Sequence, residues 1–91
     1  MATTFTLTDN ELRAARILLQ DCLDNMGGER PADLANDPFT WCEARTLVNA
    51  GFSRHEAAGT YGALIEKGFV VDEGRDSYIA DDGWRFMDTI W

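Results

Sequence analysis

The stretch GFSRHEAAGTYGALIEKGFVV, residues 51–71, decides the fold, because it contains a helix together with the signals that start and stop it. Ser53 is placed to cap the helix, and Glu56, three residues later, completes a capping box. Gly68 tolerates the left-handed conformation in which helices commonly end. These signals predict a helix over residues 54–67. Its inward positions recur three and four residues apart and are Ala57, Tyr61, Leu64 and Ile65.

Another helix is predicted directly before this one, over residues 38–50. Its start is open between two residues: Asp37 would cap a helix that begins with the next proline, whereas Thr40 would open a rival capping box. Gly51 ends the helix. Since only the short segment AGFS separates the two helices, together they form a helix-turn-helix. The inward residues of the earlier helix are expected to be Trp41, Ala44, Leu47 and Val48.

The N-terminal part predicts a longer helix, over residues 9–26. Thr8 and Glu11 have the spacing of a capping box, and Gly27 follows the last apolar position. A polar connection over residues 27–37 comes next, with one helical turn near its middle. The apolar face of this helix is expected to contain Leu12, Ala15, Leu19, Cys22, Leu23 and Met26.

The C-terminal part predicts a β-hairpin over residues 69–80, with a polar turn centred on Gly74. A last short helix follows over residues 82–90, capped by Asp81 or Asp82. The pattern therefore indicates a mainly α fold with a small hairpin, of the α+β class. The residues expected on the inner face of the last helix are Trp84, Met87 and Trp91.

Length and composition predict one globular domain, residues 1–91. Hydrophobic residues make up 45% of the chain, which is ordinary for a folded protein. The first residues have no basic region, and no apolar run is long enough to cross a bilayer, so we expect a cytoplasmic protein without a membrane partner. Cys22 and Cys42 lie in separate predicted helices without CxxC spacing, and this arrangement favours buried, reduced thiols over a disulfide.

The chain resembles the winged-helix family, particularly the MarR-type and related small regulators. The resemblance rests on residues 51–71 and on YIADDGW, residues 78–84, and it covers about residues 39–86. It implies a winged helix-turn-helix in which helix 54–67 and the turn of the hairpin contact the partner. Transferred to this sequence, the partner-binding residues are Arg54, His55, Ala58, Gly59, Thr60, Gly62, Ala63 and Arg75.

The charge of the chain departs from what a DNA-binding member of that family needs. The chain has sixteen acidic and eight basic residues, so its net charge is −8. Residues 39–80 alone hold four basic and six acidic residues, a net charge of −2. Because phosphate contacts by Lys and Arg drive most of the affinity for DNA, this charge disfavours DNA and favours a basic protein partner.

Gly59 and Gly62 lie in the middle of helix 54–67, where each glycine costs about 1 kcal/mol relative to alanine. This cost suggests that another body comes close to the helix backbone. Three interpretations are open: a helix of the same domain packs there, a partner packs there, or the glycines are simply tolerated.

Nothing in the chain has the pattern of an active site, a metal site or a cofactor site. His55 is the single histidine, and its spacing from Cys42 or from a serine points to no nucleophilic pair. Two cysteines and one histidine are too few for a zinc site, and no glycine-rich loop follows a strand. The sequence therefore predicts a protein that is not an enzyme and holds neither cofactor nor metal.

Two functions compete. The first is a non-enzymatic, acidic interaction module that binds a basic protein, in the manner of small phage or mobile-element inhibitors that imitate DNA. The alternative is a transcriptional regulator that binds DNA through helix 54–67 and the wing at residues 72–76. Winged-helix regulators often dimerise through terminal helices, so the resemblance also implies a homodimer. The expected dimer contacts are Trp84, Ile90 and Trp91.

Overall fold

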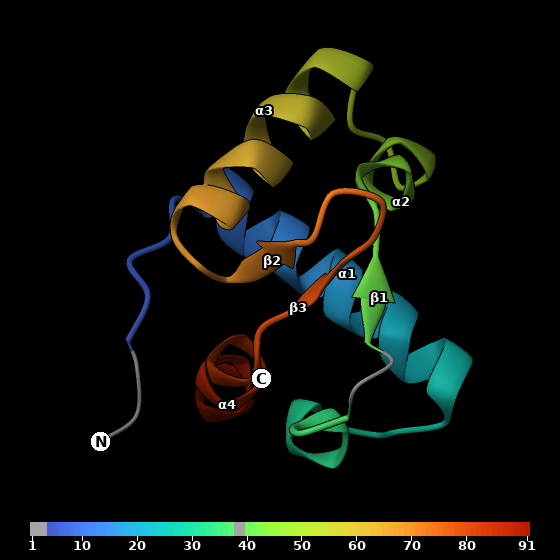
Figure 1. Cartoon of the computed structure of the whole chain (residues 1–91), viewed down its shortest axis with the longest axis vertical. Coiled ribbons are helices and arrows are strands. Elements are labelled where there is room, and N and C mark those ends of the chain that lie inside the picture. Colours follow the sequence, from blue (N-terminus) through green and yellow to red (C-terminus); the bar gives the residue numbers. More distant parts are fainter. Residues whose placement is uncertain (1–3, 38–39) are drawn as a thin grey trace.

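The computed structural model describes residues 4–37 and 40–91, which form a mainly helical fold with a small antiparallel sheet (Figure 1). This arrangement confirms the predicted α+β class. The helices and strands of the described residues, in chain order, are α1 (Asp9–Met26), the 3-10 helix η1 (Pro31–Leu34), β1 (Trp41–Cys42), α2 (Ala44–Asn49), α3 (Arg54–Glu66), β2 (Val70–Asp72), β3 (Ser77–Ile79) and α4 (Asp81–Ile90).

Helix α1 has the predicted bounds, and its local signals act as expected. The Thr8 side chain accepts a hydrogen bond from the backbone N–H of Glu11, and the Glu11 carboxylate accepts one from the backbone N–H of Thr8. Gly27 ends the helix with φ of 84°. The inner face is shifted from the predicted one, because Ala14 and Leu18 are fully buried while Met26, in the last turn, is 38% exposed and left partly uncovered.

Helix α3 begins at the predicted residue and ends at Glu66, one residue before the predicted end. The capping box of Ser53 and Glu56 is formed, and Gly68 adopts φ of 79° just after the helix. The backbone N–H of Phe69 then donates to the carbonyl of Leu64, which closes the helix end. Of the predicted inner residues, Ile65 is half-buried and the others are buried: Ala57, Tyr61 and Leu64.

The predicted helix over residues 38–50 is wrong in its first half. Trp41 and Cys42 form strand β1, and the helix covers only Ala44–Asn49. Thr40 does not cap a helix: it is buried, its hydroxyl donates to the carbonyl of Ile79, and its own carbonyl accepts the Ile79 N–H. The alternative start at the proline after Asp37 lies outside the described residues. Pairing with β3 outweighed the local helix signals, because a neighbouring strand satisfies the same backbone groups.

The sheet has the strand order β1-β3-β2, and both pairs are antiparallel. The hairpin of β2 and β3 confirms the prediction for residues 69–80, and Gly74 lies in its turn with φ of 94°. Trp41 pairs directly with Tyr78, so both side chains lie on the same face of the sheet. Because side chains alternate along a strand, Trp41 is 56% exposed instead of inward as predicted.

Helix α4 starts one residue earlier than predicted, and no carboxylate caps it. Ala80 is the N-cap residue and makes no side-chain hydrogen bond. The Asp81 carboxylate accepts instead from the backbone N–H of Asn36, at 2.8 Å, and from Arg85, at 2.9 Å. Contacts with the loop before β1 therefore replace the expected local cap.

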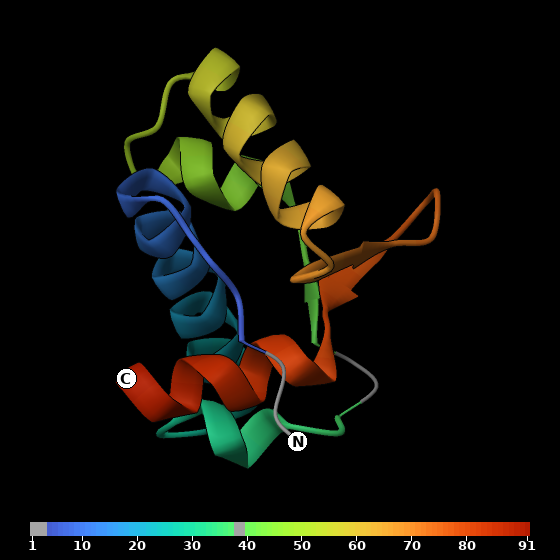
Figure 2. The same ribbon diagram turned by 90° about the vertical axis from the view of Figure 1, so that its left-hand side faces the viewer.

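The core lies where α1 meets the other elements. Figure 2 shows α2 and α3 at one end of α1, and α4 with η1 at the other end, while the hairpin projects from the side of the molecule. Among the described residues, no helix has both the length and the apolar character that a bilayer crossing needs. The largest side chains at the centre are almost completely buried: Trp84, Phe69, Leu18, Leu19, Leu23, Leu47, Leu64, Ile79 and Met87.

Candidate functional site

Most of the predicted partner-binding residues of α3 lie on the side of the helix opposite Ala57, Tyr61 and Leu64. The hairpin turn that carries Arg75 projects away from the body of the molecule (Figure 2). Six of the eight predicted residues are exposed, and Thr60 and Ala63 are half-buried. We call five exposed residues on this side of the helix the α3 outer face: His55, Ala58, Gly59, Gly62 and Glu66.

The α3 outer face has open space above its glycines. A Cβ atom added to Gly59 or Gly62 would meet no atom of the described chain within 4 Å outside its own helix. At Gly83 in α4, by contrast, an added Cβ would lie 3.2 Å from the Phe69 carbonyl oxygen. The interpretation that another helix of the domain packs on these glycines is therefore wrong. A partner surface and simple tolerance remain.

Most of the basic side chains contact other groups of the same chain. Within the described residues, three basic side chains have no hydrogen bond, ion pair or ring contact: Arg45, Arg54 and Arg75. All three belong to the part of the chain that contains α2, α3 and the hairpin. The other basic side chains contact a carboxylate, a main-chain carbonyl or an aromatic ring, and they are Arg13, Arg16, Arg30, Lys67 and Arg85.

The two cysteines are free thiols, as expected, although Cys42 lies in a strand and not in a helix. Burial raises the pKa of Cys22 to about 12 and that of Cys42 to about 11, so both remain protonated near neutral pH. His55 lies exposed in the first turn of α3 and has no hydrogen bond to either thiol. The geometry therefore offers no activated thiolate.

A polar network joins α3 to the sheet, and the sequence pattern did not predict it. The Tyr61 hydroxyl donates to the Cys42 carbonyl at 3.1 Å and also contacts the Ser77 hydroxyl. Ser77 donates to the same carbonyl at 2.9 Å. Burial is the main reason that the pKa of Tyr61 is raised. Because these residues are 16 to 35 positions apart, no local spacing signals their contact.

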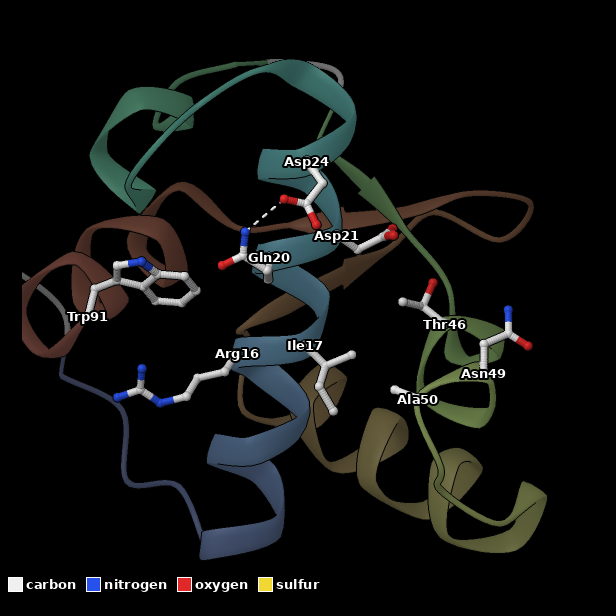
Figure 3. A pocket seen from close by; sticks show the side chains of 9 residues that line it. All are labelled: Arg16, Ile17, Gln20, Asp21, Asp24, Thr46, Asn49, Ala50 and Trp91. Carbon is white, nitrogen blue, oxygen red and sulfur yellow. Dashed lines mark hydrogen bonds between the residues drawn. The ribbon is translucent and has the colours of Figure 1, made fainter.

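A groove of about 710 Å³ lies between α1, α2 and the C-terminal end (Figure 3). Arg16 donates to the Ile90 carbonyl at 2.9 Å, and its guanidinium carbon is 5.6 Å from the centre of the Trp91 ring. Asp21 and Asp24, on α1 between Trp91 and the α2 residues in Figure 3, contribute negative charge. The groove therefore combines an aromatic ring with charges of both signs.

The expected dimer contacts divide into two groups. Trp84 is 1% exposed, because it packs into the core of its own chain, so its assignment as a dimer contact is wrong. Ile90 and Trp91 are 41% and 37% exposed, beside the groove. Dimerisation through these two residues stays a prediction.

Comparisons with known proteins add no relative. No protein-family model, curated protein sequence or solved structure matches this chain. In the described part of the chain, His, Cys, Asp and Glu side chains form no group that could hold a metal ion. The functional argument therefore depends on the surfaces described above.

Proposed function

We propose that this chain is a non-enzymatic interaction module of the cytoplasm, which binds a protein partner through the α3 outer face and the hairpin turn of a winged-helix frame. Three structural features support this frame. Residues 50–53 are a short connection between α2 and α3, as in a helix-turn-helix. The hairpin follows α3 directly, and β1 pairs with β3 to complete the sheet.

The bare backbone at Gly59 and Gly62 is the observation that carries the proposal. Each glycine makes the helix less stable by about 1 kcal/mol than alanine would. No neighbour within the described chain is close enough to exclude a side chain at these positions. A partner that packs directly on the helix backbone does require glycine there, because a Cβ atom would hold the partner away.

The charge of the module selects the class of partner. With a net charge of −8, the protein attracts basic surfaces and repels phosphate groups. A basic, nucleic-acid-binding protein is the natural complement, and an inhibitor of such a protein can act by imitating the charge of DNA. This role is the one we propose, on the pattern of phage or mobile-element inhibitors.

Replacing both glycines with alanine tests the proposal. The G59A/G62A variant is expected to be more stable than the wild type by about 1 kcal/mol per site, because both positions are open and helical. It is also expected to lose at least tenfold in affinity for the partner. The measurements are urea unfolding and retention of proteins from a lysate of the source cells on immobilised wild-type and variant chains.

Asn25→Ala on α1 serves as the control, since Asn25 is exposed and lies on a different helix. A basic protein retained by the wild type and the control, but not by G59A/G62A, supports the proposal. Equal retention by all three chains would show that the α3 outer face is not the binding surface.

A DNA-binding regulator is the second candidate, favoured by one observation. The three basic side chains without a contact in the described chain, Arg45, Arg54 and Arg75, all lie in the α2, α3 and hairpin part. We expect them to be too few against the surrounding carboxylates, so the protein should pass through a heparin column at low salt. Retention that is lost in the R54A/R75A variant would instead establish DNA binding as the better proposal.

A further inference from the structure

A pocket of about 450 Å³ lies beside the exposed face of the sheet, separate from the α3 outer face. The hairpin turn, β3, β1 and the start of α4 contribute to its wall. Trp41 and Tyr78, which pair across β1 and β3, provide two neighbouring aromatic rings on the same face. Such rings attract cations, and most strongly when the cation is a planar guanidinium.

All the charged side chains that the described residues contribute to the pocket wall are acidic. Among the described residues that line it, none is Arg, Lys or His. Arg85 pairs with Asp81, but no basic side chain of the described residues pairs with Glu73 or Asp76. The Glu73 carboxylate accepts a hydrogen bond from the Tyr78 hydroxyl and raises the pKa of that phenol. The carboxylates of the wall belong to Asp37, Glu73, Asp76 and Asp81.

A second feature points to a ligand in the same pocket. Trp84 forms part of the pocket wall and is 1% exposed, and no described residue accepts a hydrogen bond from its indole N–H. Buried N–H groups in folded proteins nearly always have an acceptor, since leaving one unpaired is costly. A main-chain carbonyl of a bound peptide would supply this acceptor.

We propose that this pocket binds an arginine side chain of a basic peptide, with the guanidinium against Trp41 and Tyr78 and between the carboxylates of Glu73 and Asp76. On binding, the pocket wall shifts so that the Trp84 indole nitrogen, which is buried in the free chain, donates its N–H to a carbonyl of the same peptide. Arginine binds better than lysine here, because its planar group both stacks on rings and pairs with carboxylates. The site does not require the α3 outer face, so it adds a second contact to the proposed function.

The test uses a capped peptide of alternating glycine and arginine, with matched lysine and citrulline peptides. Citrulline keeps the shape of arginine but has no charge. Binding is followed by nuclear magnetic resonance through the indole N–H signals of the tryptophans, with the Trp84 signal assigned from a Trp84→Phe variant. We expect the order arginine, lysine, citrulline, with at least a tenfold difference in affinity between the first and the last, and a shift of the Trp84 signal.

Two pairs of substitutions distinguish binding in the pocket from the general electrostatic attraction of an acidic protein for a basic peptide. E73Q/D76N removes two charges from the pocket, and D24N/E29Q removes two charges from exposed positions near the end of α1 that line neither this pocket nor its neighbour. We expect the first pair to weaken arginine-peptide binding at least tenfold, as does Trp41→Ala, and the second pair to weaken it less than twofold. Equal weakening by both pairs, or a Trp84 signal that does not move, would overturn the proposal.

The outcome of the peptide titration is independent of the outcome of the G59A/G62A test on α3. If the G59A/G62A variant loses its protein partner but still binds the arginine peptide, both proposals hold. If it keeps the partner and the peptide titration still follows the expected pattern, the function proposed for α3 fails while the pocket remains.

Discussion

Replacing Phe69 with alanine is expected to lower the free energy of unfolding by about 3–5 kcal/mol, because a fully buried phenyl ring is removed and the space cannot close easily. The ring of Phe69 makes an edge contact with Phe5, with 5.3 Å between the ring centres. On its other side it lies so close to α4 that a Cβ on Gly83 would be 3.3 Å from the Phe69 ring.

The expected loss is a large part of the total stability, since a domain of this size is stable by roughly 5–13 kcal/mol. Urea unfolding followed by circular dichroism measures it. Phe69→Leu keeps most of the volume and should cost less than about 1.5 kcal/mol. If the alanine variant loses no more free energy of unfolding than the leucine variant, Phe5 and α4 do not hold the cavity open.

Replacing Lys67 with methionine is expected to lower the free energy of unfolding by about 2–3 kcal/mol at pH 7, which is less than for a fully buried ion pair because water reaches part of the lysine. The Lys67 ammonium donates to the Glu11 carboxylate and, at 2.7 Å, to the carbonyl of Thr6. The side chain of Lys67 is 35% exposed, whereas that of Glu11 is 11% exposed. Methionine retains the packing of the aliphatic part but leaves the Glu11 charge without its partner.

The effect of this substitution should depend on pH. The hydrogen bond from Lys67 holds the pKa of Glu11 below its ordinary value. A lowered pKa in the folded state adds stability above the pKa of the unfolded chain, about 4.3, and this stability disappears as the pH falls through the folded-state pKa. The difference between wild type and Lys67→Met should therefore shrink between pH 7 and pH 2.5.

A double-mutant cycle isolates the pair. Glu11→Gln keeps an acceptor for the capping box but has no charge. We expect the double variant K67M/E11Q to be more stable than K67M alone, because the unpaired carboxylate is gone. A double variant as unstable as the sum of the two single variants would mean that the ion pair contributes nothing to stability.

The ends of the helices could be predicted from the sequence because they depend on neighbours within about four residues. The capping boxes at Thr8 and Ser53 and the glycines at 27 and 68 act as predicted. Local signals failed where a distant strand competed. Thr40 has the spacing of a helix cap, but β3, almost forty residues further along the chain, pairs with its segment instead.

The candidate binding residues show the same division. The outer positions of α3 follow from the period of the helix, so the sequence was sufficient to place Gly59 and Gly62 together. The pocket proposed to bind arginine could not be predicted, because Trp41 and Glu73 approach each other only after β1 joins the hairpin.

By itself the sequence determined where α1 and α3 begin and end, the position of the hairpin, and a surface with twice as many acidic as basic residues. Only the tertiary structure decided that Trp41 lies in a strand, that Lys67 neutralises Glu11, and that nothing in the described chain covers Gly59 and Gly62. The physical reason is the distance along the chain between the interacting residues. Caps and turns are satisfied within a few bonds of the chain, whereas strand pairing, ion pairing and burial depend on which distant segments meet.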